Sequence, residues 1–77
     1  MSEKLPRLTA KELIRVLERK GWELDRSRGS HHIYVHPAFQ RTLSVPVARR
    51  PMSIGTLARL LKDAEISRDE LRRLLEH

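Results

Sequence analysis

Residues 22–47 read WELDRSRGSHHIYVHPAFQRTLSVPV, and apolar side chains recur there with a period of two. Such alternation is typical of strands with one buried face. It predicts strands over residues 22–26, 31–36 and 42–47, joined by turns at 27–30 and 37–40. Connections this short join antiparallel neighbours, so the segment predicts a three-stranded meander. Pro46 cannot donate to a ladder, so the third strand is expected to have a free side.

Helices are expected on both sides of this segment. Thr9 and Glu12 have the spacing of a capping box, which predicts a helix over residues 8–20, and Gly21 is placed to end it. Two further helices are expected after serine caps: residues 54–64 after Ser53, and a short one over 67–75, where Ser67 and Glu70 form a second capping box.

The element order predicts an α+β fold of the double-stranded-RNA-binding type, α-β-β-β-α with an added short C-terminal helix. Both main helices would cover one face of the antiparallel sheet and leave the other face open. One domain is expected over residues 1–77, with its core at about 8–66. Residues 75–77, Leu-Glu-His, also resemble the start of a vector-derived tag.

The composition narrows the class of protein. The 77 residues carry a net charge of +6, with 39% hydrophobic and 34% charged residues, which is typical of a soluble basic domain and not of a disordered tail. The apolar runs are too short to span a membrane, and the first residues lack a secretory signal. The absence of cysteine excludes disulfides, thiolate chemistry and cysteine zinc sites. The cytoplasm is the expected compartment.

The charge is unevenly distributed. The 37 residues from Arg26 to Lys62 contain no acidic side chain and seven basic ones. These are Arg26, Arg28, Arg41, Arg49, Arg50, Arg59 and Lys62. A stretch of one sign favours contact with a phosphate backbone, and arginine suits bidentate phosphate contacts. An acidic protein partner would fit the same surface, and chance unevenness is the plain alternative.

Two other modes of nucleic-acid binding are disfavoured. The main helices are separated by strands, which is unlike a helix-turn-helix. Tyr34 is the only obvious base-stacking candidate, and a single tyrosine on a strand is more often sheet packing.

Three histidines fall on the second predicted strand. Ile33 and Val35 are expected to point inward, which would place His32, Tyr34 and His36 on the open face. His32 and His36 would then lie roughly 13 Å apart at about 3.3 Å per residue, too far to share a metal ion. No metal or cofactor is therefore expected.

An exposed histidine can act on RNA without a metal. RNA carries its own nucleophile, the 2′-hydroxyl, and a neutral imidazole can take its proton while arginines stabilise the charge on the phosphate. Composition and spacing alone leave two interpretations open: a histidine without a role, and a catalytic base.

Four segments together carry a resemblance to a family. They are LIRVLERKGW at 13–22, RGSHH at 28–32, LSVP at 43–46 and IGTLARLLK at 54–62. In this order and spacing, over about residues 8–66, the chain resembles the HicA toxins, small mRNA interferases of toxin–antitoxin systems that are paired with HicB antitoxins. The resemblance implies an RNA-cleaving enzyme whose partners are mRNA and a HicB-type antitoxin.

The resemblance also implies site residues. The essential histidine of the family's Gly-Ser-x-His motif falls on His32, while His31 would shape the turn or face the helices. RNA contacts are expected from Arg26, Arg28, Gly29, Ser30, Arg41, Arg49 and Arg50. Gly55 would either leave a helix N-terminus open to phosphate or allow close helix–sheet packing.

The chain departs from the family at three places. Many members have a histidine shortly after Val-Pro, where this chain has Val47-Ala-Arg49-Arg50, and Glu65 stands where a glycine usually follows the second helix. The third helix lies beyond the family's core pattern. Two alternatives stay open: an RNA-binding module without catalysis, and a protein-interaction domain for an acidic partner.

Overall fold

The computed structural model describes residues 5–76, so the predictions made for residues 1–4 and His77 fall outside it. The elements follow the predicted order, α1(Ala10–Arg19), β1(Glu23–Arg28), β2(His31–His36), β3(Phe39–Pro46), α2(Ile54–Ala64) and α3(Arg68–Leu75). The strands form one antiparallel sheet in the order β1-β2-β3. The predicted α+β fold is confirmed.

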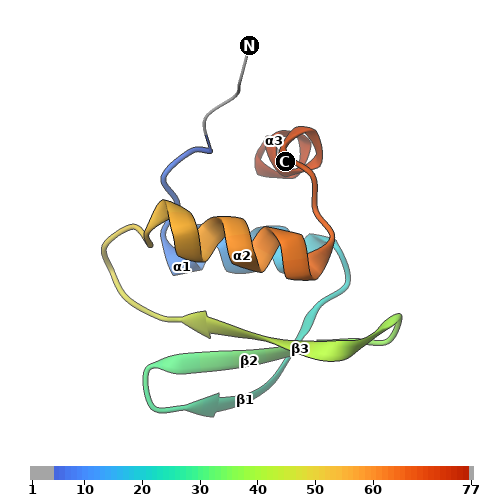
Figure 1. Cartoon of the computed structure of the whole chain (residues 1–77). Coiled ribbons are helices and arrows are strands. Elements are labelled where there is room, and N and C mark those ends of the chain that lie inside the picture. The colour runs from blue at the N-terminus through green and yellow to red at the C-terminus, as the bar shows by residue number, and fades with distance from the viewer. Residues whose placement is uncertain (1–4, 77) are drawn as a thin grey trace.

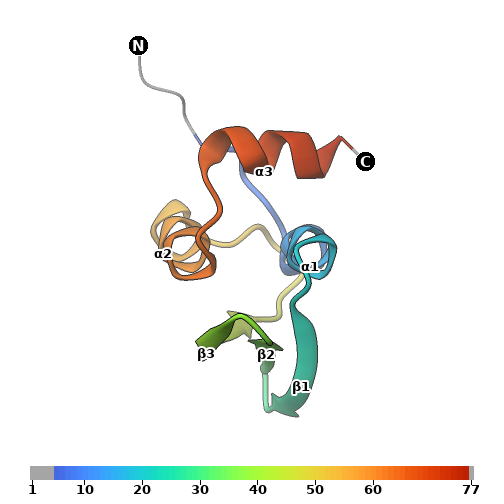
Figure 2. The same cartoon turned by 90° about the vertical axis from the view of Figure 1, so that its right-hand side faces the viewer.

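Three layers make up the molecule. Helices α1 and α2 lie side by side over one face of the sheet, and α3 crosses above them on the side away from the sheet (Figures 1 and 2). The core lies mainly between the sheet and the first helix layer. Its largest fully buried side chains are Trp22, Leu13, Leu17, Leu43, Leu57, Leu71, Val16 and Val45.

The helix starts follow from local sequence. Thr9 accepts a hydrogen bond from the Glu12 backbone N–H, and the Glu12 carboxylate accepts from the Thr9 N–H, so the predicted capping box is present. Ser53 accepts from the Thr56 N–H at 3.1 Å to begin α2. Gly21 has a φ of +97° directly after α1, as its predicted role at the helix end requires.

The boundaries of two strands differ from prediction. β1 runs from Glu23 to Arg28, and all six of its residues are exposed, whereas Trp22 precedes it and is only 1% exposed. The prediction of a half-buried strand was wrong because the helices do not cover this edge. β3 begins at Phe39 rather than at Thr42, because the second turn is confined to Pro37 and Ala38.

The prediction that His32, Tyr34 and His36 face the open side was also wrong. In the β2–β3 ladder Tyr34 lies opposite Leu43 and His32 opposite Val45. Leu43 and Val45 are at most 1% exposed in the core, and directly opposed residues share a face of the sheet. His32 and Tyr34 therefore face the helices, and the His36 ring contacts the buried Trp22, with centroids 5.1 Å apart.

Candidate active site

The β1–β2 hairpin turn fixes the position of His32. Gly29 and Ser30 form the turn, and Gly29 has a φ of +58°, which matches the type II′ turns that favour glycine first. The backbone N–H of Val47 donates to the Ser30 carbonyl at 2.7 Å, so pairing continues beyond the end of β3. His32, the second residue of β2, is thereby held beside the segment that leaves β3.

A groove of about 630 Å³ opens beside His32. Three segments line it: the start of α1, the start of β2 and the chain after β3. The lining residues are Thr9, Ala10, Lys11, Ile14, His32, Val47, Ala48 and Arg49. Since the Met52 N–H donates to the Leu8 carbonyl at 2.8 Å, the loop after β3 is also tied to the segment before α1. The groove therefore lies at one end of the domain, where all three segments meet.

The His32 ring has one nitrogen that a ligand cannot reach. Its Nδ1 is buried and has no hydrogen-bond partner among the described residues. A buried nitrogen cannot exchange a proton with a molecule arriving from solvent, so any proton transfer would have to use Nε2. The residue as a whole is half-buried. Packing, rather than a hydrogen bond at Nδ1, sets the orientation of the ring.

Tyr34 lies next to His32 on the same face, with ring centroids 6.5 Å apart. Tyr34 is 2% exposed, and burial, followed by the charge of Glu18, raises the pKa of its hydroxyl above the ordinary value of 10.0. The hydroxyl is therefore neutral at physiological pH. A buried phenol in this state supports the packing of the sheet and is not a base or a platform for an exposed nucleobase.

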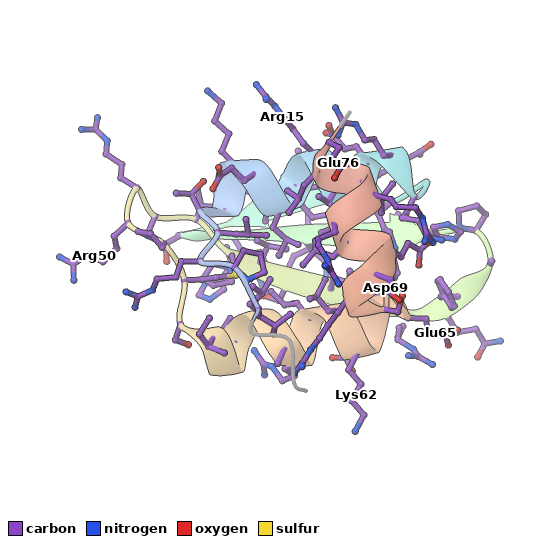
Figure 3. All side chains as sticks on the ribbon, turned by 90° about the horizontal axis from the view of Figure 1, so that it is seen from above. Arg15, Arg50, Lys62, Glu65, Asp69 and Glu76 are labelled. Carbon is purple, nitrogen blue, oxygen red and sulfur yellow. The ribbon has the colours of Figure 1, made fainter. Side chains whose placement is uncertain are left out.

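Three of the predicted RNA-contacting arginines lie at the same end as His32. Arg49 lines the groove, and Arg50 follows it in the loop, where its side chain extends away from the body of the molecule (Figure 3). Arg28 ends β1 directly before the turn and lies opposite His31 in the ladder. All three are exposed, so the hairpin and the loop after β3 give this end a positive charge.

Arg26 and Arg41 have other surroundings. Arg26 forms an ion pair with Asp25. Arg41 donates to the Asp63 carbonyl at 2.9 Å, lies 3.7 Å from the Glu65 carboxylate and covers the Phe39 ring at 5.6 Å. Arg41 also lies four residues before Val45, roughly 13 Å along the strand. The structure does not bring it to the groove, and Figure 3 shows Glu65 and Arg50 at opposite ends of the molecule.

His36 has a structural environment of its own. Its Nδ1 accepts from the Ala38 N–H at 2.9 Å, which leaves Nε2 to donate to the Lys20 carbonyl at 2.8 Å. The ring also contacts Trp22 and Phe39, with centroids 5.1 and 5.0 Å away. Both nitrogens are occupied, so His36 joins the end of α1 to the second turn. Within residues 5–76, no cluster of three side chains suited to a metal ion occurs.

Sequence reasoning missed the contribution of α1 to the groove. Lys11, Ala10 and Ile14 lie in the first turns of a helix whose sequence segment is nearly neutral overall. Counting charge along the chain could not assign Lys11 and Arg49 to the same groove, because only the folded chain brings α1 to the end of β3. A Cβ on Gly55 would meet nothing within 4 Å, so close helix–sheet packing does not explain the glycine at this position.

Among curated proteins, no sequence matches the chain. None of the helices within residues 5–76 has the length and apolar character needed to cross a bilayer. The family model described as "HicA toxin of bacterial toxin-antitoxin" matches residues 10–66, from the first residue of α1 to just beyond α2. The match covers most of the chain and leaves out α3, so the protein belongs to the HicA family of bacterial toxins.

Proposed function

We propose that this toxin is an endoribonuclease that cleaves RNA in the cytoplasm with His32 as general base and without a metal ion. The observation that carries the proposal is the position of His32 in a groove flanked by Lys11 and Arg49. The partially exposed imidazole offers a proton acceptor, and the two cations offer charge stabilisation for a phosphate.

The proposed reaction uses the RNA's own 2′-hydroxyl. Nε2 of His32 takes the proton of this hydroxyl while its oxygen forms a bond to the adjacent phosphorus. The bond from phosphorus to the 5′-oxygen of the next nucleotide breaks, and that oxygen leaves with a proton from solvent or a neighbouring donor. The products are a 2′,3′-cyclic phosphate and a 5′-hydroxyl. Lys11 and Arg49 would stabilise the added negative charge on the phosphate in the transition state.

A HicB-type antitoxin is the proposed protein partner. The family belongs to toxin–antitoxin systems, which supports an antitoxin in general terms. Arg28, Arg49 and Arg50 gather at the His32 end, so an antitoxin with acidic side chains would find a complementary surface there. Binding at this end would block access to the groove.

The decisive experiment compares two neighbouring histidines. His32→Ala and His31→Ala are expressed and assayed on single-stranded RNA with EDTA present, and each is checked for folding by circular dichroism. His32→Ala should reduce cleavage by about 10²–10⁴-fold, as expected for loss of a general base. His31→Ala, which changes an exposed residue outside the groove, should leave the rate nearly unchanged.

One observation favours the alternative of an RNA-binding module without catalysis. A general base is usually oriented by a hydrogen bond at its second nitrogen, and Nδ1 of His32 has none among the described residues. Binding of RNA by folded wild type without any cleavage would select this alternative. Equal cleavage by wild type and His32→Ala would instead show that the base is misassigned.

A further inference from the structure

The groove beside His32 has two kinds of surface. Its walls are formed mainly by apolar atoms of Ala10, Ile14, Val47 and Ala48. Val47 is 38% exposed, so an aliphatic side chain is accessible beside a basic surface. Lys11 and Arg49, both exposed, stand at the margins. Neither forms an ion pair with another residue in the range 5–76.

The polar side chains at the start of α1 are engaged with each other. The Thr9 hydroxyl takes part in the cap of α1, and the Glu12 carboxylate accepts from the Thr9 backbone N–H at 2.9 Å. No acidic residue lines the groove. The free charges at its margin are therefore positive, and the walls offer almost no hydrogen-bonding groups. This combination fits a ligand with an apolar face and an attached anion.

We infer that the groove receives one unpaired nucleobase of the RNA, with the adjoining phosphate held between Lys11 and Arg49 next to His32. This inference rests on the proposed function, and it defines the substrate as a single-stranded segment. Every nucleobase has an apolar face of the kind that packs on such a wall, and its sugar carries the phosphate needed by the cations. The volume of about 630 Å³ is within the ~300–1,000 Å³ usual for small-ligand sites.

The walls also set the selectivity of the subsite. Aliphatic side chains cannot read the hydrogen-bonding edge of a base, so the groove distinguishes an unpaired nucleotide from a paired one and does not distinguish the four bases. The fold resembles that of double-stranded-RNA-binding domains, but this site requires a base that has left its helix. The ribose attached to a base held in the groove would bring its 2′-hydroxyl towards His32.

The test measures binding without cleavage. The probe is a fluorescent single-stranded RNA with a 2′-O-methyl group on every ribose, which keeps bases and phosphates and removes the nucleophile. Val47→Asn makes a groove wall polar without changing charge. Leu24→Asn is the matched control, because Leu24 is an exposed aliphatic residue, at 50%, outside the groove. Affinity is read by fluorescence anisotropy after both variants are shown to be folded.

Val47→Asn should weaken binding about three- to tenfold, and Leu24→Asn should change it less than about twofold. A probe with one abasic position should bind wild type more weakly than the intact probe, and this difference should shrink in Val47→Asn. If Val47→Asn does not fold, Ala48→Asn takes its place. Lys11→Ala should weaken intact and abasic probes equally and reduce the salt dependence by about one phosphate contact.

Equal affinities of Val47→Asn and Leu24→Asn would overturn the inference. Loss of antitoxin binding in Val47→Asn with unchanged RNA affinity would overturn it too, and would assign the groove to a protein side chain. Failure of the proposed function gives a different result. Unmodified RNA would then stay uncut by the wild type, while Val47→Asn would still bind the methylated probe more weakly than Leu24→Asn.

Discussion

Gly21 and His36 meet at the point where α1 ends: a Cβ on Gly21 would lie 2.9 Å from Nε2 of His36. The same nitrogen is held 2.8 Å from the Lys20 carbonyl, so the ring cannot move aside without losing that contact. Glycine at this position satisfies both a φ of +97° and the close approach of the ring.

Gly21→Ala should therefore lower the free energy of unfolding by more than the roughly 1–2 kcal/mol of a left-handed alanine alone. Gly29→Ala is the control, because Gly29 also has a positive φ but a Cβ there would meet nothing within 4 Å. Urea unfolding of both variants measures the difference. Equal losses would mean that the contact with His36 carries no cost.

His36→Phe should destabilise the fold by about 1–3 kcal/mol, because the Lys20 carbonyl and the Ala38 N–H both lose their partner. RNA cleavage per folded molecule should not change, since His36 lies at the end of β2 away from the groove. Thermal unfolding and the cleavage assay are measured on the same preparation. A stable His36→Phe that cuts RNA poorly would contradict this separation of roles.

Glu65 occupies a left-handed conformation, with a φ of +58°, at the end of α2. Glycine adopts this conformation without strain, so Glu65→Gly should raise the free energy of unfolding by about 0.5–1 kcal/mol. The ion pair with Arg41 is exposed and contributes little. Arg41→Gln, measured by the same unfolding curves, separates the loss of the pair from the relief of strain, and a net loss in Glu65→Gly would refute the prediction.

The raised pKa of Tyr34 has a consequence at high pH. Since the folded state holds the phenolic proton more tightly than the unfolded chain, the stability it contributes is complete below pH 10 and declines as pH rises through the folded pKa. Tyr34→Phe should therefore show a smaller loss of stability above pH 10 than wild type. Urea unfolding midpoints of both proteins, measured about every half pH unit between roughly pH 8 and pH 11.5, test this expectation. Parallel pH profiles of wild type and Tyr34→Phe would contradict it.

A substitution at Leu71 tests whether α3 contributes to the stability of the fold, although the family match ends before α3. The side chain is fully buried, so Leu71→Ala should cost about 2–5 kcal/mol. Arg73→Ala on the exposed side of the same helix should stay within about 0.5 kcal/mol. A small effect of Leu71→Ala would mean that α3 only rests on the other helices.

Local signals explain which parts of this fold were predictable. Thr9, Ser53 and Ser67 each cap a helix where the sequence indicated, because a cap depends on residues within one turn. The capping box predicted for α3 is only half formed: Ser67 accepts from the Glu70 N–H, but the Glu70 carboxylate pairs with Lys20, the residue after α1. This partner lies 50 positions away, and no local pattern identifies it.

The face of β2 depended on distant residues. Ile33 and Val35 alternate with His32 and Tyr34, and hydrophobicity alone favoured the two aliphatic residues as the inward pair. The ladder with β3 decides otherwise, since Val45 and Leu43 bring their partners towards the helices. Alternation along the strand predicted that His32, the histidine of the family motif, would face the open side of the sheet. His32 lines the groove instead because it faces the helices. Its assignment as the base stays a prediction.

The hydrogen bond between Ser30 and Val47 joins the β1–β2 hairpin to the chain that follows β3. His32, Val47 and Arg49 therefore belong to one wall of the groove, and Lys11 and Ile14 of α1 belong to the other. The core side chains between α1 and the sheet set the spacing of these two walls, and with it the width of the groove. A core substitution that changes this spacing should therefore change the proposed RNA cleavage, even though it does not touch the groove.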